Sequence, residues 1–273
     1  MATPIGNARD ITLRALDVLK SCDAIAAEDT RVTSKLLAIF GVSRPLFPYN
    51  DHNAAQARPR LLARLRAGER VVLVSDAGTP LVSDPGYKLV RDAIAEGLAV
   101  HAIPGASAAL AALVVAGLPT DRFLFAGFLP SRSGERRSAL EELKNVPATL
   151  VFFESPQRLA ESLADMEAVL GPRPAAVTRE LTKLHEESRR GDLAALATAY
   201  SIESAPKGEV TIVVGGARPG EPDFAKADSL LEAALEFMPV RAAADLVATA
   251  LDLPRRESYA RALAIKTKRD EQA

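Results

Sequence analysis

Strand and helix patterns alternate along most of this 273-residue chain, and this alternation is the feature that most constrains its fold. Short apolar runs, such as RVVLVS (70–75) and TLVFFE (149–154), are each followed by a stretch with helical periodicity. Strands joined through helices pair in parallel, and the helices cover the faces of the sheet. We therefore expect an α/β fold with mostly parallel sheets.

Two interruptions of this alternation predict three parts. GLPTDR (117–122) is typical of a linker, and the strand–helix pattern starts again after it. ARPGEPDFAKAD (217–228) is rich in Pro, Gly and acidic residues and precedes a helical remainder. We expect an N-terminal α/β domain over residues 1–118, a second α/β domain over 119–216, and a helical, helix-turn-helix-like module over 220–273.

Some local patterns predict single elements. AVHAI (99–103) is typical of a strand in which His101 is a structural residue. Thr30 is placed to cap a helix that ends at Gly41. AAVTREL (175–181) and KGEVTIVVGG (207–216) predict the last two strands before the helical module.

Composition excludes several classes of protein. No apolar run approaches the roughly 20 residues of a membrane-spanning helix, and MATPIGN lacks the basic and apolar regions of a signal peptide. Cys22 is the only cysteine, which excludes an intrachain disulfide and fits a cytoplasmic location. The three His residues are far apart in the sequence, so we expect no metal site.

The loop VSDAGTPLVSDPG (74–86) lies between an expected strand and an expected helix, where α/β proteins bind ligands. Asp76 and Asp84 disfavour a phosphate, and the two Pro residues have no amide hydrogen to donate to one. The loop suits a ligand with hydroxyls, amines or positive charge, such as S-adenosylmethionine, because carboxylates accept hydrogen bonds from these groups. Alternatively, Asp76 and Asp84 only cap turns.

A second loop has the same form. IPGASAALAALVVAGLP (103–119) ends a strand in Pro-Gly and opens a helix of small residues, with Ser107 near its N-terminus. Ser107 either bonds a ligand or only caps the helix. Two such loops at successive strand ends are what a ligand crevice at the carboxyl edge of a sheet requires.

Eight motifs identify a known family. They follow in order over residues 2–216: ATPIGNARDITLRAL, AAEDTRVT, VSDAGTPLVSDPG, PGASA, GFLP, FFESPQRL, RELTK and KGE. Together they resemble the ribosomal RNA small subunit methyltransferase I family of the tetrapyrrole methylase superfamily. The resemblance implies two α/β/α domains with S-adenosylmethionine in the cleft between them, and a homodimer. It also implies methyl transfer to the ribose 2′-hydroxyl of a cytidine in the decoding region of 16S rRNA.

The resemblance further implies which residues bind the cofactor. They belong to three loops of the first domain and to strands of the second: Pro4, Ile5, Asp76, Gly78, Thr79, Ser107, Ala108, Phe152 or Phe153, Thr178, Glu209 and Val210. Members of the family carry a strand of the form LYIV directly before ATPIGN. Since this chain begins at Met1, we expect its first sheet to lack most of that central strand and the natural start to lie upstream.

Methyl transfer to a ribose hydroxyl requires a base, or a cation that lowers the pKa of the hydroxyl. The candidates are charged residues of two motifs, Glu28 and Arg31 of AAEDTR together with Glu180 and Lys183 of RELTK. Asp29 belongs to the same set, but it is equally suited to cap a helix. For each motif the alternative is an ion pair that holds its loop, and the sequence does not choose among them.

Local arginines are the expected contacts to RNA, since the net charge of −1 neither favours nor excludes it as a partner. Arg132, Arg136 and Arg137 of PSRSGERRSAL predict a phosphate clamp, with plain solvated surface as the alternative. Arg255 and Arg256 begin the basic second helix of a helical pair, which we interpret as an RNA-docking module.

Two other functions are compatible with these patterns. A methylase of a tetrapyrrole or of a protein residue would share the fold, but it would have no need of EDTR, RELTK and the basic appendage. A non-enzymatic regulator would sense a small ligand and bind nucleic acid through the C-terminal helices.

Overall fold

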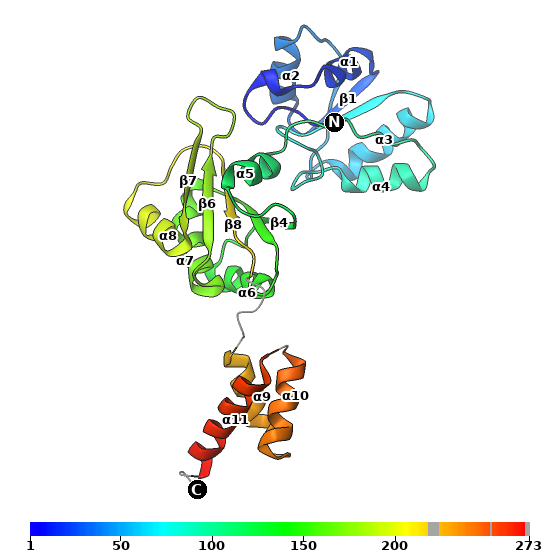
Figure 1. The fold of residues 1–273 in the computed structure, drawn as a ribbon. Helices are drawn as coiled ribbons and strands as arrows, with labels where there is room; N and C mark the ends of the chain where they lie inside the picture. Colours follow the sequence, from blue (N-terminus) through cyan, green and yellow to red (C-terminus); the bar gives the residue numbers. More distant parts are fainter. Residues whose placement is uncertain (218–223, 252, 271–273) are drawn as a thin grey trace. The chain divides into compact units, whose positions relative to one another are not determined.

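The computed structural model describes residues 1–217, 224–251 and 253–270, and the chain forms two compact units, Met1–Gly216 and Ala217–Ala273 (Figure 1). The first unit contains two β-sheets, and the described part of the second is helical. Half of the expected joint over 217–228 (residues 218–223) lies outside the described residues.

The first sheet is a three-stranded parallel sheet in the order β2-β1-β3. Its strands are β1 (Ala24–Ala27), β2 (Leu46–Pro48) and β3 (Val71–Val74). Around it lie η1 (Ala8–Asp10), α1 (Leu13–Ser21), α2 (Thr30–Ile39), α3 (Ala54–Arg66) and α4 (Tyr87–Ala95).

The four residues of the central strand β1 are all buried, as in a strand covered on both faces. Ile25 belongs to the apolar cluster formed with α1 and α2, whereas Ala26 belongs to the cluster formed with α3 and α4. This alternation places two helices on each face of the sheet. The parallel arrangement expected from the alternating pattern is therefore confirmed for this sheet.

The strand expected over residues 99–103 is not formed. The backbone of this segment makes only one hydrogen bond that resembles sheet pairing, from the amide of Ala2 to the carbonyl of Ile103 (3.0 Å). On the other side of the N-terminal segment, the Met1 ammonium donates to the carbonyl of Leu73 in β3 (2.9 Å). Residues 1–3 thus lie between β3 and residues 99–103, which have no further strand to pair with and stay extended without a ladder.

The second sheet has five strands in the order β4-β5-β8-β6-β7 and is mixed. Only β4 and β5 pair in parallel, so the expectation of a mostly parallel sheet is wrong here. The strands are β4 (Phe123–Phe128), β5 (Thr149–Glu154), β6 (Pro174–Arg179), β7 (Glu187–Asp192) and β8 (Val210–Val214). The short turn 180–186 makes β7 return antiparallel beside β6, and β8 runs antiparallel to both of its neighbours, β5 and β6.

Sequence patterns missed β7 and the helix that follows it, α8 (Leu193–Ile202). The sequence of β7, ESRRGD, contains no apolar residue, so it has no alternating pattern to detect. It lies at the edge of the sheet, where charged residues are tolerated because one side of the strand has no neighbour.

Helices cover both faces of the second sheet. On one face lie α6 (Ser133–Leu143), α7 (Leu159–Leu170, preceded by η2, Pro156–Arg158) and α8. On the other lies α5 (Ala108–Ala116), whose alanines and Leu113 pack on β5, β6 and β8. The helix before residue 118 thus belongs to the core of the second sheet. A domain boundary near residue 118 stays a proposal. It is based on the position of this residue between α5 and β4, the first strand of the second sheet.

The second unit consists, in its described part, of α9 (Phe224–Ala234), α10 (Val240–Ala250) and α11 (Arg255–Asp270). Small residues allow the helices to pack closely, with Ala243 and Ala244 of α10 against Leu231 and Ala262. The helix expected over 240–250 is confirmed, and the one expected over 255–265 continues to Asp270.

A buried cluster of charges joins α6 to α7. The Arg136 side chain is 1% exposed, and its Nε lies 2.6 Å from Oδ2 of Asp165, which is itself 4% exposed. Arg137 and the Ser133 hydroxyl also donate to this carboxylate. Burial raises the pKa of Asp165, but these hydrogen bonds outweigh burial and hold it below its ordinary value. Arg136 is therefore no RNA contact, contrary to expectation, because its guanidinium is consumed inside the fold.

Removing one partner of this cluster leaves an unpaired buried charge. We expect Asp165→Asn to lower the free energy of unfolding by about 3 kcal/mol, measured by urea unfolding and circular dichroism. The matched control is Arg132→Met, which removes an exposed pair with Glu135 and should change stability by less than about 0.5 kcal/mol. Equal effects of the two variants would contradict this interpretation.

Candidate functional site

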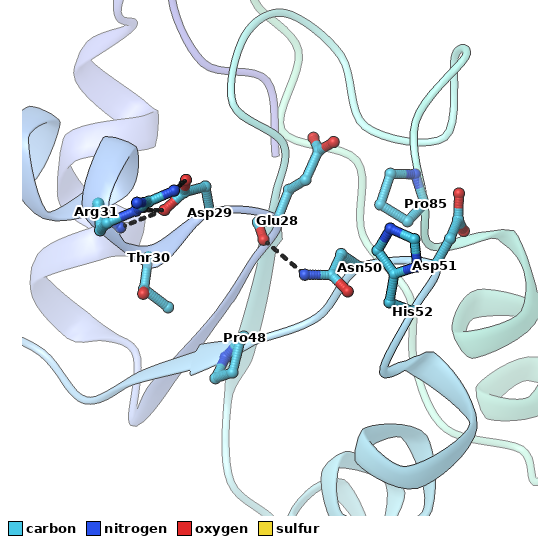
Figure 2. Close-up of a pocket in the computed structure, with 9 residues that line it drawn as sticks. All are labelled: Glu28, Asp29, Thr30, Arg31, Pro48, Asn50, Asp51, His52 and Pro85. Atoms are coloured by element: carbon cyan, nitrogen blue, oxygen red, sulfur yellow. Dashed lines mark hydrogen bonds and ion pairs between the residues drawn. The ribbon is translucent and has the colours of Figure 1, made fainter.

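Two neighbouring cavities lie at the carboxyl ends of the first sheet's strands. The inter-sheet cavity, of about 390 Å³, extends from these strand ends to β5 and β8. The β1–β2 cavity, of about 430 Å³, is lined by Glu28–Arg31, Pro48, Asn50–His52 and Pro85 (Figure 2). Both volumes fall in the range of small-molecule sites, about 300–1,000 Å³.

A backbone bridge fixes the floor of the inter-sheet cavity. The Thr3 amide donates to the Gly78 carbonyl (2.8 Å), and the Gly78 amide donates back to the Thr3 carbonyl (3.1 Å). Gly78 has a φ of +75°, and an added Cβ would lie 3.4 Å from Cγ2 of Ile5. Glycine is thus required for the left-handed backbone conformation, and its backbone lies in contact distance of the N-terminal loop.

The rest of the 74–86 loop is held in a strained conformation. Leu81 and Ser83 have φ values of 73° and 64°, a region that residues with a Cβ rarely adopt. The Thr79 hydroxyl donates to the Ala106 carbonyl (3.2 Å), which joins this loop to the one before α5. Such strain persists only where the surroundings hold it, and it concentrates at functional sites.

The first-sheet side of the inter-sheet cavity is acidic. Burial raises the pKa of Asp76, Asp84 and Glu28 above their ordinary values. The Asp76 amide donates to Oε2 of Glu28 (3.3 Å), and Asp76 accepts from the Asp29 amide (2.9 Å). These side chains are therefore fixed at the strand ends, where they favour a ligand that donates hydrogen bonds or carries positive charge.

The second-sheet side is largely apolar. The ring of Phe153 lies edge-on to Phe128, with a centroid distance of 5.6 Å, and both line the cavity. The small side chain of Ala108 at the start of α5 leaves space in the cavity, while Ser107 caps the helix by accepting from the Leu110 amide. An acidic wall facing an aromatic wall suits a flat group that carries amines or hydroxyls.

Most of the expected cofactor residues meet in this cavity. Nine line it: Ile5, Asp76, Gly78, Thr79, Ser107, Ala108, Phe153, Glu209 and Val210. Three do not. Phe152 points to the opposite face, into the core with α7, because neighbouring strand residues alternate in direction. Thr178 is buried and donates to the Thr211 carbonyl, and Ile5, not Pro4, faces the cavity.

Several lining residues were not expected on the cofactor site. They come mainly from the end of the 74–86 loop, β4, the FFESPQR motif and β8: Glu28, Ala77, Val82, Ser83, Asp84, Phe128, Glu154, Ser155, Pro156, Gly208 and Thr211. Motif membership was the available signal, since all of these residues except Thr211 lie within the eight motifs.

Glu180 and Lys183, expected as catalytic candidates, line neither cavity. Lys183 Nζ lies 2.7 Å from Oε1 of Glu180 and 2.9 Å from Oε2 of Glu209. Glu180 also accepts from the Glu209 amide (3.1 Å). The two residues therefore fix Glu209, which does line the inter-sheet cavity, and this is the ion-pair alternative for RELTK.

The same turn contacts the N-terminal loop. The Asn7 amide donates to the Thr182 hydroxyl (3.1 Å), and Thr182 has a positive φ of 68°. A Cβ on Gly6 would overlap the Lys183 side chain. The N-terminal loop thus connects the 74–86 loop of the first sheet to the 180–183 turn of the second.

Of the AAEDTR candidates, Glu28 borders both cavities, whereas Asp29 and Arg31 border only the β1–β2 cavity. Of the two capping candidates, Asp29 and Thr30, it is Asp29 that is the N-cap of α2, and it accepts from the Arg31 amide (2.8 Å). Hydrogen bonds from the Arg31 side chain and amide lower the pKa of Asp29 to about 2. Asp29 is thus a structural carboxylate, and the Arg31 side chain, 86% exposed, extends into solvent.

The remaining expected RNA contacts lie on the surface. Arg132 and Arg137 flank the start of α6, and Arg255 and Arg256 begin α11 of the second unit. Among the described residues, no three His, Cys, Asp or Glu side chains are grouped so as to hold a metal ion. None of the helices in the described ranges is long and apolar enough to cross a membrane.

Sequence comparisons identify the family of the chain. The profile of the Tetrapyrrole (Corrin/Porphyrin) Methylases matches residues 2–197, and that of the RsmI C-terminal HTH domain matches residues 221–266. A protein of Mesorhizobium japonicum named Ribosomal RNA small subunit methyltransferase I is 52% identical over 97% of this chain and 91% of its own length. One of the same name from Escherichia coli O157:H7 is 46% identical over 96% and 92%.

Solved structures agree on the fold. Diphthine synthase aligns with a TM-score of 0.62 at 16% identity, over 78% of this chain and 88% of its own. A uroporphyrin-III C-methyltransferase from Thermus thermophilus, complexed with S-adenosylhomocysteine, aligns with a TM-score of 0.54 at 22% identity, over 78% and 94%.

The Lys183 pairs predict a pH-dependent loss of stability. Hydrogen bonding to Lys183 lowers the pKa of Glu180, so its stabilisation is present above the unfolded pKa of about 4.3 and is lost as pH falls through the folded value. We expect Lys183→Met to lower the free energy of unfolding by about 1 kcal/mol at pH 7, and by progressively less as pH falls through the folded pKa of Glu180. Urea unfolding over a series of pH values from 7 downward measures this, with Lys207→Met as control. A difference that does not depend on pH would contradict it.

Proposed function

Because the chain belongs to the tetrapyrrole methylase family, we propose that it transfers a methyl group from S-adenosylmethionine to 16S rRNA of the small ribosomal subunit. The acceptor is the ribose 2′-hydroxyl of a cytidine in the decoding region. The observation that carries the substrate is the identity of about one half, over nearly the whole chain, to relatives named for small-subunit rRNA methylation. The match of the C-terminal unit to the helix-turn-helix module of the same proteins supports it.

The inter-sheet cavity fits the cofactor. Asp76 and Glu209 are acceptors for its ammonium and ribose hydroxyls, and the acidic wall stabilises a positive sulfonium. The small side chain of Ala108 leaves space for the flat adenine ring, and Phe153 forms one side of that space. When bound, S-adenosylmethionine supplies an electrophilic methyl group on sulfur. The chain's own contribution is to orient it, to exclude water with Phe128 and Phe153, and to bring the acceptor hydroxyl in line.

Glu28 is the group we assign as general base. Its carboxylate lies at the wall that the two cavities share, and burial raises its pKa, with the neighbouring Asp84 and Asp76 carboxylates adding to the rise. A carboxylate of raised pKa is a stronger base, and it accepts the proton of the 2′-hydroxyl as the O–C bond to the methyl group forms and the bond between methyl and sulfur breaks, its electron pair remaining on sulfur. Glu180 and Lys183 instead position Glu209, and Asp29 caps a helix.

Arginines whose side chains are exposed at the surface are the proposed contacts to RNA phosphates. Arg132 and Arg137 in the first unit and Arg255 and Arg256 in the second place guanidinium groups on loops and helix starts. Such contacts position the RNA without reading its sequence. A tetrapyrrole or protein acceptor and a non-enzymatic regulator are not favoured by the comparisons.

Assembly and location are also part of the proposal. We propose a homodimer, supported by Leu110 and Val114, which are exposed one turn apart on α5 outside both sheet cores. We propose the cytoplasm of a bacterium as the location, because the small ribosomal subunit is the substrate.

Methyl incorporation tests the function directly. Small ribosomal subunits that lack the modification, incubated with the protein and labelled S-adenosylmethionine, should yield labelled 2′-O-methylcytidine on nucleoside analysis. Subunits that already carry the modification are the control and should take up no label. Label on a base or in ribosomal protein would contradict the assigned acceptor. Cofactor binding without any labelled RNA would return the tetrapyrrole or protein acceptor to first place.

Glu28→Gln tests the base. We expect kcat to fall by about 10²–10⁴-fold, with an unchanged affinity for S-adenosylhomocysteine by calorimetry. In the wild type, activity should decline as pH falls through the raised pKa of Glu28, because only the carboxylate accepts a proton; the variant should lose this acid limb. Glu167→Gln, an exposed change on α7, is the matched control. An unchanged acid limb in Glu28→Gln would exclude it as the base.

A further inference from the structure

The β1–β2 cavity is separate from the cavity proposed to bind the cofactor. It opens at the carboxyl ends of β1 and β2, while the inter-sheet cavity lies beside the loop after β3 and the N-terminal end of α5. Glu28 is the only described residue that lines both. Figure 2 shows Glu28 between Asp29–Arg31 on one side and Asn50–His52 with Pro85 on the other. A molecule in the β1–β2 cavity therefore meets the cofactor cavity at the Glu28 carboxylate.

Two side chains in this cavity are available for a ligand. Among the described residues, no hydrogen bond or ion pair involves the Asp51 carboxylate or the His52 ring. In contrast, Asn50 is held by its side chain, which donates to the Glu28 carbonyl (3.3 Å) and accepts from the Asn53 amide. Asn50 thus fixes the backbone that presents Asp51 and His52 beside Glu28.

The chemistry of these walls suits one nucleoside. His52 offers a flat ring, and Pro48 and Pro85 offer apolar surface, a combination that stacks an unstacked base. The Asp51 carboxylate only accepts hydrogen bonds when ionised, and in nucleic-acid recognition it accepts from the exocyclic amine of cytosine. Uracil presents a carbonyl oxygen at the same position, which a carboxylate repels. The acidic walls disfavour a phosphate, so the backbone of the RNA stays outside, next to the exposed Arg31.

We propose that the β1–β2 cavity binds the acceptor nucleoside of the RNA, unstacked from its neighbours, with His52 against the base and Asp51 selecting cytosine through its amine. The inference rests on the proposed function and adds the site that chooses the base. The ribose then lies toward Glu28 and the cofactor cavity. Asp51 and His52 determine specificity, whereas Arg31 contacts a flanking phosphate at the rim.

The test compares two RNA substrates that differ only in the base at the acceptor position, cytosine or uracil, in the small ribosomal subunit. We expect wild-type kcat/KM to favour cytidine by at least tenfold. Asp51→Ala should lower kcat/KM for cytidine by about tenfold or more, leave that for uridine nearly unchanged, and so remove the preference. Asp51→Asn should reduce the preference for cytidine over uridine, since the amide of Asn also donates a hydrogen bond to the carbonyl oxygen of uracil. His52→Ala should lower both rates by weakening stacking.

Controls separate binding of the nucleoside from folding and from the cofactor. Asp17→Ala and His101→Ala change exposed residues outside both cavities and should leave the two rates unchanged. Calorimetry with S-adenosylhomocysteine should give the same affinity for all variants. Equal losses on both substrates in Asp51→Ala, or an unchanged preference, would overturn the assignment while the proposed function stands. A wild-type protein that methylates neither RNA would overturn the proposed function and this site together.

Discussion

The backbone bridge between Thr3 and Gly78 is the contact on which the rest of the site depends. It holds the N-terminal loop against the loop after β3, so that Ile5 reaches the inter-sheet cavity. The same loop continues to Asn7, which bonds the turn of the second sheet at Thr182. One short segment therefore makes hydrogen bonds to loops of both sheets, which share no strand. A side chain at Gly78 is disfavoured at this bridge, because it would have to adopt a left-handed backbone conformation.

The charge of the site explains a division of labour. Both cavities are bordered by carboxylates, although the proposed substrate is a polyanion. A carboxylate wall selects cations and hydrogen-bond donors, which S-adenosylmethionine and a nucleoside provide at their reacting ends. In the proposed function, the phosphates are bound by arginines outside the cavities, such as the exposed Arg132 and Arg255. The net charge of −1 does not reveal this arrangement, since the acidic residues that repel phosphate and the arginines that attract it lie at different places on the protein.

Local sequence signals predicted the α/β class and the ligand loops, because the conformation of a turn depends on residues that are close in the sequence, such as Asp76 and Gly78. Properties that depend on distant partners were not predicted in the same way. Phe152 and Phe153 are equivalent in composition, and only the register of β5 decides which faces the cavity. Arg136 has the sequence context of a surface arginine, but Asp165, 29 residues later, buries it. The strand β7 has no apolar pattern and was missed. Residues 99–103 have an apolar pattern but form no strand, because they have no neighbouring strand to pair with.

The position of β8 has a consequence for how the protein is made. This strand lies between β5 and β6, yet among the strands in the described part of the chain it is synthesised last. Until Val210–Val214 leave the ribosome, β5 and β6 have no common partner, and the apolar faces of α5 and α7 have no complete sheet to cover. At about 5–20 residues per second, this open interval after β6 lasts on the order of seconds. The second sheet therefore closes late in translation, and the nascent chain exposes unpaired strand edges until then.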